Sequence, residues 1–370
     1  MLILFLLFIF SLSPAFSGPF PDSDGKPIVA GKVAAWNALS SISSSLSPPI
    51  RVKKFPKITG AFVQFSGGDN DREHGPFSEQ QKAAFWEREL ESMKKAGLDT
   101  LIIQFNQYEG VHFSDVTRRI LIAADAIGID VFVGTALNEK SWFSNKHNPF
   151  FLSKEAKIIS DYTRILVNQF KFHPSFVGVY IPQEDNTLAF PAPIGAFYAV
   201  IAKAVKEEKP SLKVMISPYT TLIPGVAKSF PKHVLEYYFK TVLSRAKVDI
   251  CAWQDGVGGT EKQLERVSHD LGTLSNVCKM YKVQLWANIE VFHRTAAWNK
   301  PFSAEPTHIE TLLRQLAAEA PYSKKVICFD FNHYFSPNNG VSKAKKLYDA
   351  YLTYLESQER LILRNSTFQK

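Results

Sequence analysis

The stretch Phe176-Val-Gly-Val-Tyr-Ile-Pro-Gln-Glu184 sets a pattern that recurs along this 370-residue chain. A short run of apolar residues ends abruptly in polar ones. Runs of this length, rich in Val, Ile and aromatic residues, are typical of strands buried on both faces of a sheet. Eight such strands are predicted, at residues 58–65, 100–104, 130–134, 176–181, 214–217, 248–252, 284–289 and 326–331.

Amphipathic segments fill the gaps between these runs and predict helices. Ser78-Glu-Gln-Gln81 has the spacing of a capping box and opens a helix that ends at Gly97. Ser114 is expected to cap the next helix, which ends at Gly128. The other predicted helices cover residues 154–171, 194–208, 232–245, 261–281, 307–318 and 342–356.

Strands that alternate with helices imply a parallel sheet with right-handed crossovers. Eight such units fit a single closed (β/α)₈ TIM barrel, which we place at residues 57–357. A doubly wound open sheet is the alternative, but it normally carries a glycine-rich phosphate turn after its first strand. Gly67-Gly68 does not have the G-x-G-x-x-G pattern, and the sequence contains no P-loop. The barrel is therefore the predicted fold.

The two ends of the chain have a different composition. Residues 1–10 are an apolar run that stops at Ser11, and Ala15-Phe-Ser17 fits a small-residue cleavage site. Residues 1–17 are therefore interpreted as a signal peptide of a secreted protein, because the run is too short for a membrane span of ~20 residues. An uncleaved anchor is the alternative. Residues 18–56 form a Ser- and Pro-rich flexible arm, and residues 358–370 a polar tail.

The charge and the cysteine content argue against a nucleic-acid-binding protein and against a fold held together by disulfides. The formal net charge of +8 has no block of Lys and Arg behind it, so nucleic-acid binding is not expected. Cys251 and Cys328 lie within apolar runs and are predicted to be buried thiols without a disulfide framework. We expect a monomer that needs no cofactor and does not insert stably into a membrane.

Catalytic residues of such barrels lie where the strands end at their carboxyl side. Amides, carboxylates and aromatic rings are concentrated at these places, whereas Lys, Arg and glycine-rich turns are scarce. Sugar hydroxyls need amide and carboxylate partners, so the pattern predicts a carbohydrate substrate, an oligosaccharide or a polysaccharide. The polar and aromatic candidates at the strand ends are Gln64, Gln104, Asn106, Trp142, Gln183, Tyr219, Trp253, Gln254, Asp255, Asn288 and Tyr334.

Two carboxyl groups are the minimum for cleavage of a glycosidic bond. Glu184 and Glu290 are the best pair, because each directly follows a strongly predicted strand. Asp255 is the main competitor; it contacts substrate or else caps its loop by an Asx turn.

A Glu after the fourth strand and another after the seventh resemble the clan A glycoside hydrolases. The stretches 58–65, 178–184, 253–258 and 286–290 also resemble a family of glycosidase-like barrels, domain of unknown function 4434. The resemblance implies that Glu184 is the general acid/base and Glu290 the nucleophile of a retaining hydrolase or transglycosidase. It departs at Gln183, where clan A enzymes usually have Asn; the longer side chain places the amide differently.

The resemblance also suggests roles for the neighbours of this pair. Amide side chains would bind sugar hydroxyls, Asn288 would support Glu290, and four rings would form stacking walls. The hydroxyl-binding amides are Gln104, Asn106, Gln183 and Gln254, and the rings are Trp142, Tyr219, Trp253 and Trp298.

Two other functions fit the same strand ends. One is a carbohydrate-binding barrel without catalysis, whose carboxyl groups lie too far apart to cooperate. The other is a metal-dependent hydrolase that uses Asp255, Asp330 and histidines.

Overall fold

The computed structural model describes residues 55–65, 78–185, 190–220, 230–297 and 299–367. One compact unit comprises Pro56–Trp298 and Phe302–Lys370 and contains the whole barrel. A second unit, Met1–Phe55 with Asn299–Pro301, lies almost wholly outside the described residues. The expected signal peptide and nearly all of the expected arm therefore fall outside them as well.

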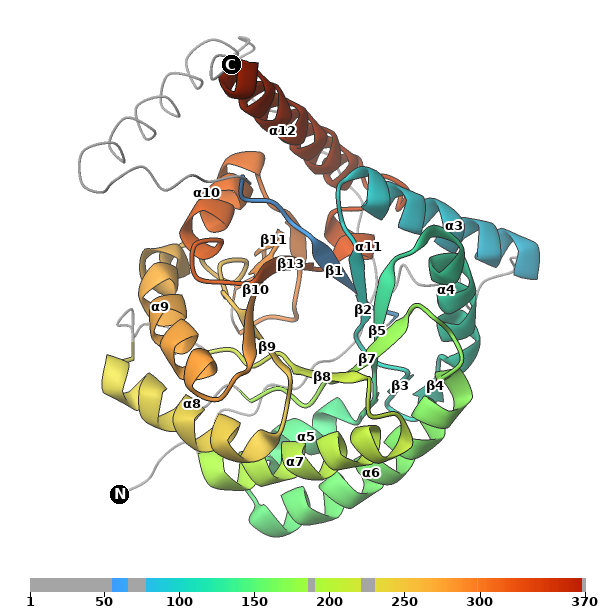
Figure 1. Ribbon diagram of the computed structural model, residues 1–370, viewed down its shortest axis with the longest axis vertical. Coiled ribbons are helices and arrows are strands. Elements are labelled where there is room, and N and C mark those ends of the chain that lie inside the picture. Colours follow the sequence, from blue (N-terminus) through green and yellow to red (C-terminus); the bar gives the residue numbers. More distant parts are fainter. Residues whose placement is uncertain (1–54, 66–77, 186–189, 221–229, 298, 368–370) are drawn as a thin grey trace. The chain divides into compact units, whose positions relative to one another are not determined.

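Eight parallel strands close into a barrel and confirm the predicted fold (Figure 1). Each strand pairs with the next one in the chain, and the last, β13, pairs with the first. The predicted strands agree with the observed ones to within a few residues. In the order of the chain they are β1 (Gly60–Val63), β2 (Thr100–Ile103), β5 (Asp130–Gly134), β7 (Phe176–Ile181), β8 (Lys213–Ile216), β9 (Ile250–Gln254), β10 (Gln284–Glu290) and β13 (Lys325–Phe329).

Helices surround the barrel as an outer layer (Figure 1). The predicted capping box of Ser78 is present, and Gly128 ends its helix in the left-handed conformation with a φ of 71°. The helices are α3 (Glu79–Lys95), α4 (Ser114–Ile127), α6 (Pro149–Phe170), α7 (Pro191–Glu208), α8 (Lys232–Ala246), α9 (Leu264–Met280), α10 (Ile309–Glu319) and α12 (Ser342–Thr367).

Several helix boundaries differ from the prediction, among them those of α4, α6 and α12. Ser114 is the first helical residue of α4 rather than its cap, and its hydroxyl accepts a hydrogen bond from the Asn106 amide. Helix α6 begins earlier because Asn148 caps it and Pro149 occupies its first turn. Helix α12 continues to Thr367, so most of the expected polar tail is helical.

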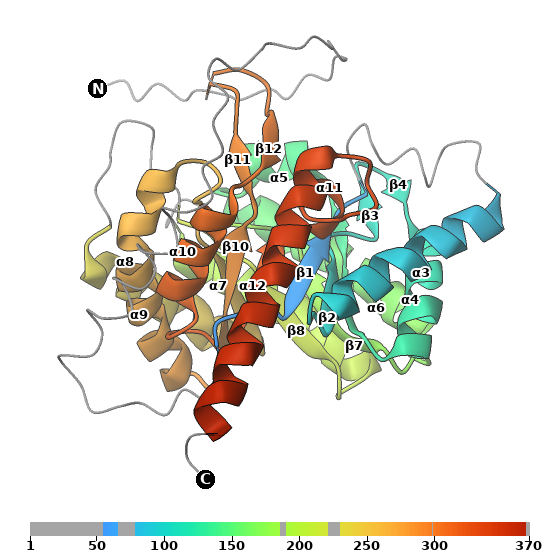
Figure 2. The ribbon, with the colours of Figure 1, turned by 90° about the horizontal axis from the view of Figure 1, so that it is seen from above.

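Shorter elements that the sequence did not predict follow the strands at one end of the barrel (Figure 2). A three-stranded sheet of β3 (Gln107–Tyr108), β4 (Val111–His112) and β6 (Ala136–Leu137) is followed by α5 (Glu139–Asn145). The hairpin of β11 (Phe292–Arg294) and β12 (Ala304–Pro306) follows β10. Helix α11 (Phe331–Tyr334) follows β13, and the single turn η2 (Glu261–Gln263) precedes α9. These elements build the rim where the strands end.

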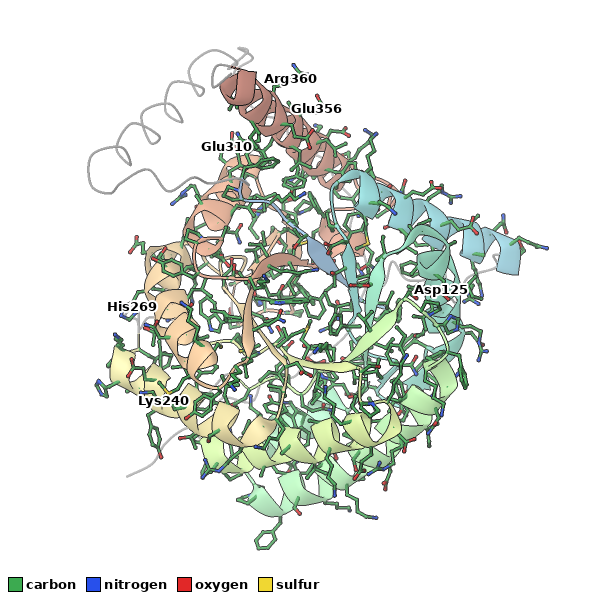
Figure 3. All side chains as sticks on the ribbon, viewed as in Figure 1. Asp125, Lys240, His269, Glu310, Glu356 and Arg360 are labelled. Carbon is green, nitrogen blue, oxygen red and sulfur yellow. The ribbon has the colours of Figure 1, made fainter. Side chains whose placement is uncertain are left out.

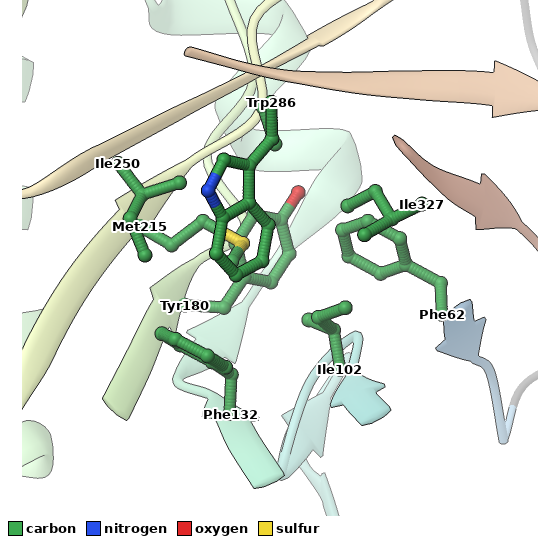
Figure 4. Packing of buried hydrophobic residues seen from close by; sticks show 9 residues of the cluster. Phe62, Ile102, Phe132, Tyr180, Met215, Ile250, Trp286 and Ile327 are labelled. Carbon is green, nitrogen blue, oxygen red and sulfur yellow. The ribbon is translucent and has the colours of Figure 1, made fainter. Parts of the chain in front are cut away.

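Large side chains pack together in the barrel interior (Figure 4). The cluster takes at least one residue from each strand: Phe62, Ile102, Phe132, Tyr180, Met215, Ile250, Ala252, Trp286 and Ile327. Gly178 makes room for the Phe132 ring, since a Cβ at this position would lie 2.2 Å from it. Side chains of a strand alternate between its two faces, so residues two positions further along face the same interior. Gln64, Gln104, Gln254 and Asn288 occupy such positions above the apolar layer.

The exterior is charged, as the helix pattern predicts. Asp125, Lys240, His269 and Glu310 lie on the outer helices (Figure 3). All three cysteines are buried free thiols, which confirms the prediction for Cys251 and Cys328. Among the described residues, we find no helix with the length and apolar character needed to span a bilayer.

Candidate active site

Glu184 and Glu290 enter the same mouth from two separated strands. Glu184 lies three residues after β7, and Glu290 is the last residue of β10. Strands β8 and β9 stand between them in the barrel. Because all strands are parallel, both carboxyl groups lie at the carboxyl end of the barrel.

Glu184 is partly buried and has two neutral hydrogen-bond donors. The Tyr180 hydroxyl donates to Glu184 Oε1 at 2.9 Å, and the Gln254 amide also bonds this carboxyl group. The indole N–H of Trp142 donates to the Glu184 carbonyl oxygen at 2.8 Å and fixes the backbone. Burial outweighs the two donors and raises the pKa of Glu184 to about 7, with a smaller contribution from the nearby Glu139. A carboxyl group of this kind holds a proton close to neutral pH.

Glu290 is held by backbone groups of the loop after β9. The Gly259 N–H donates to Glu290 Oε2 at 3.2 Å, and the Gly258 N–H supports the same carboxylate. Residue 258 has to be glycine here, since a Cβ would lie 2.8 Å from Glu290 Oε2. Burial and the negative charge of Asp255 nevertheless raise the pKa of Glu290.

The two carboxyl groups interact with each other. The negative charge of Glu184 is one of the causes that raise the pKa of Glu290. It is the smallest of the causes named, after burial and the charge of Asp255, and it favours states in which one of the two groups is protonated. Such a pair can supply an acid and an anion together.

Asp255, the main competitor for a catalytic role, is a structural residue. Its side chain is 1% exposed. Asp255 Oδ1 accepts the N–H of Val257 at 3.0 Å, which is an Asx turn, and the N–H of Glu290 at 3.2 Å. Of the two roles left open by the sequence, the structure shows the loop cap.

Two predicted amides reach the centre of the mouth. Gln254 donates to the Ser217 carbonyl at 2.7 Å as well as bonding Glu184. Asn288, expected to support Glu290, instead donates from Nδ2 to the Ser217 hydroxyl at 3.2 Å. Its backbone carbonyl accepts the Asp255 N–H at 3.2 Å.

Four predicted binding residues have structural roles instead. The expectation that Trp142 and Trp253 form stacking walls is wrong, because the two indoles are 1% and 0% exposed. Gln183 is also buried, and its amide donates to the Ala136 carbonyl at 2.6 Å. The Asn106 amide is fully engaged with Ser114, Tyr162 and Thr117, so it anchors α4 rather than a ligand.

The remaining predicted residues line the rim. Gln64 and Gln104 are partly exposed at the ends of β1 and β2, and the Gln64 backbone is bonded to the Asn332 side chain. Tyr219 bridges to Gln254 through the backbone. The Tyr334 ring packs on Phe292, with centroids 5.1 Å apart. Trp298 lies outside the described residues.

Three residues for which the sequence pattern predicts no role lie close to the two carboxyl groups. Tyr180 was visible only as a strand residue four positions before Glu184, a spacing that carries no special signal. Gln315 and Glu319 lie on α10, on the layer that surrounds the strands, and are buried beside Asp255 and Glu290. Their spacing of four residues puts both on one helix face, but an apolar face would have been the usual prediction there.

The described residues contain no cluster of three or more His, Cys, Asp or Glu side chains suited to a metal ion. Asp330 and His333, candidates for such a site, bond each other: His333 Nδ1 lies 2.7 Å from Asp330 Oδ2. Asp330 Oδ1 accepts the His333 N–H at 3.0 Å and caps α11.

Comparison with solved structures finds other proteins with the same barrel fold. A protein described as a "putative alpha-L-fucosidase" from Bacteroides thetaiotaomicron superposes with a TM-score of 0.66 at 21% identity, over 84% of this chain and 99% of the other. A β-galactosidase from the psychrophilic Marinomonas ef1 gives a TM-score of 0.51 at 10% identity, over 82% of this chain and 60% of the other. A β-glucosidase from Thermotoga maritima gives 0.50 at 12% identity, over 82% and 99%. At these identities the likeness concerns the fold.

Sequence comparison identifies the family. No curated protein matches the sequence. The model of a domain of unknown function, DUF4434, matches residues 58–341, which is most of the chain and nearly all of the barrel. The chain belongs to the DUF4434 family.

Proposed function

We propose that this protein is a retaining glycoside hydrolase or transglycosidase in which Glu184 is the general acid/base and Glu290 the nucleophile. The observation that carries the proposal is the pair itself. Two carboxyl groups from β7 and β10 interact in one mouth, and burial raises the pKa of each. A retaining site needs two carboxyl groups ~5–5.5 Å apart, one protonated and one ionised.

The first step uses the shared proton. Glu290 attacks the anomeric carbon while the bond from that carbon to the glycosidic oxygen breaks, and Glu184 gives its proton to the departing oxygen. The bond electrons leave with the oxygen, so a neutral alcohol departs and a glycosyl ester of Glu290 remains. Glu184 is then ionised and can act as a base.

The second step reverses these roles. Glu184 takes a proton from water, and the water oxygen attacks the anomeric carbon and displaces Glu290. An acceptor sugar in place of water gives transglycosylation. Bound substrate also determines where the shared proton lies, since the glycosidic oxygen faces one carboxyl group and the electron-poor anomeric carbon faces the other.

The surroundings of each carboxyl group suit its role. Tyr180 and Gln254 are neutral, so Glu184 has close neighbours that tolerate either protonation state. Backbone N–H groups of Gly258 and Gly259 point at Glu290 and orient an anion. Because a signal peptide is predicted at the start of the chain, we also propose that the protein acts on a glycan outside the cell.

Activity is tested with a panel of aryl glycosides and polysaccharides. The wild type should release sugar from at least one of these substrates. The variants E184Q and E290Q should not release sugar from that same substrate. Proton NMR of the first product formed should show the anomeric configuration of the substrate. Inversion would refute the nucleophilic role of Glu290, and glycan binding without turnover would identify a binding barrel.

A further inference from the structure

Behind Glu290 lies a buried polar network that the two catalytic steps do not use. It joins the loop after β9 to α10 through Asp255, Gln315 and Glu319, whose side chains are between 0% and 1% exposed. These two carboxyl groups and one amide are removed from water. They are expected to form hydrogen bonds with one another or with nearby backbone groups, because burying a polar group without a hydrogen bond costs free energy.

Gln315 ties Asp255 to the backbone of Glu290. Its Nε2 lies 2.6 Å from Asp255 Oδ2 and 3.0 Å from the Glu290 carbonyl oxygen. Both partners are acceptors, so the amide nitrogen must face them and both of its N–H bonds are used.

Asp255 in turn holds Glu290 from the other side. Its Oδ1 accepts the Glu290 N–H and the Val257 N–H, while its Oδ2 accepts from Gln315. The Val257 contact shapes the turn that carries the Gly258 and Gly259 N–H groups toward the Glu290 carboxylate. Asp255 therefore fixes both the strand end that bears Glu290 and the loop that orients its carboxyl group.

Glu319 needs a proton to fit this network. Among the described residues, no donor reaches either of its carboxyl oxygens, and the side chain is 0% exposed. The group in contact with it is Asp255, another carboxyl group. Two adjacent buried carboxylates would repel each other, whereas one protonated and one ionised group form a strong hydrogen bond. Asp255 has three donors already, so the proton belongs to Glu319. Burial and the charge of Asp255 also raise the pKa of Glu319 well above its usual range.

We propose that Asp255, Gln315 and Glu319 are positioning residues, in which a protonated Glu319 donates to an ionised Asp255 and the group fixes the orientation and charge of Glu290. The titratable groups that face it are Glu290 and, beyond that residue, Glu184. The effect on catalysis rests on the proposed function, but the proton arrangement does not.

Carboxyl carbon NMR of the full chain, labelled at the Glu side-chain carboxyl carbons, tests this without a substrate. E319Q and E290Q assign the two signals. Glu319 should keep the chemical shift of a protonated carboxyl group from about pH 5 to about pH 8. D255N should lower the titration midpoint of Glu290 by about one unit or more, because a negative charge beside it is removed. E319Q, which keeps a donor toward Asp255, should leave that midpoint nearly unchanged.

The matched control is E310Q, on the exposed first turn of the same helix, which should change neither signal. Ionisation of Glu319 below neutral pH would overturn the proposal, even if D255N fails to fold. A Glu290 midpoint that is the same in D255N and the wild type would also overturn it. Neither result depends on glycosidase activity, so a failure here is distinct from a failure of the proposed function.

Discussion

The surroundings of Glu184 and of Glu290 differ in kind. Glu184 is bonded by neutral side chains, the Tyr180 hydroxyl and the Gln254 amide. Glu290 is bonded by backbone N–H groups, and its own backbone is held by Asp255 and Gln315. The barrel thus holds Glu290 through backbone groups and gives Glu184 two neutral hydrogen-bond donors. The charges of Glu139 and Lys146 act on the pKa of Glu184 in opposite directions.

This difference matches the demands of the two roles. A nucleophile must point at one carbon atom, and a displacement of about 1 Å can cost about 10²-fold in rate. An acid/base must instead exist in both protonation states during one turnover. Burial raises the pKa of Glu184 to about 7, and burial with the charge of Asp255 raises that of Glu290 to about 8, so in the free protein the order of the two pKa values is opposite to the proposed roles. Bound substrate must therefore shift the proton to Glu184 before the first step.

The largest effect is expected for Glu290. E290Q keeps the shape of the side chain but removes the nucleophile, and turnover should fall on the order of 10⁴-fold. Steady-state rates on the substrate found by screening measure this. A loss below about tenfold would contradict the assignment and return Glu290 to the structural residues.

Glu184 should show a smaller loss that depends on the substrate. E184Q removes the proton donor and should lower the rate by about 10²–10⁴-fold. The loss should be least on aryl glycosides whose phenol leaves readily without protonation. In the wild type the rate should be highest between about pH 7 and about pH 8 and fall on the alkaline side, where the two carboxyl groups lose their last proton, because the pKa of Glu184 is raised to about 7 and that of Glu290 to about 8. An alkaline limb that persists unchanged in E184Q would contradict this.

The sequence predicted those features of the two environments that depend on a short stretch of neighbouring residues. The strands were found because each is a continuous apolar run, and the position of both Glu residues followed from strand order alone. The helix boundary at Gly128 was also local, since the glycine itself takes the left-handed conformation.

Other features depend on contacts between distant parts of the chain. Trp142 lies on α5 and Trp253 within β9, close to the polar residues of the mouth, but both rings are buried. The contacts from Gln315 to Asp255 and from Glu319 to the same residue span about sixty residues of sequence. A sequence without geometry gives no reason to pair an acid on an outer helix with a strand end.

A third substitution disturbs the fixed carboxyl group without changing its chemistry. In G258A the added Cβ would lie 2.7 Å from the Phe292 ring and 2.8 Å from Glu290 Oε2, so the loop or the carboxylate must shift. We expect a rate loss of about 10²-fold with little change in the pH profile. G272A on α9 is the control, since its nearest neighbour is the edge of the Tyr322 ring at 3.3 Å. An equal loss in both variants would show that the effect is general destabilisation.

The smallest effect is expected at the neutral donors of Glu184. Y180F removes the hydroxyl that donates to Glu184, and this hydrogen bond lowers the pKa of the carboxyl group. Without it the pKa of Glu184 should rise, so the alkaline limb of the rate should move to higher pH by less than about one unit. Y198F is the matched control, because the buried Tyr198 hydroxyl donates to the Gln183 carbonyl at 2.7 Å instead of to a carboxyl group. Both variants should lose about 1 kcal/mol of unfolding free energy, measured by denaturant titration. Only Y180F should shift the limb; a shift to lower pH would mean that the Tyr180 hydroxyl stabilises the protonated form, which would contradict this description of the hydrogen bond.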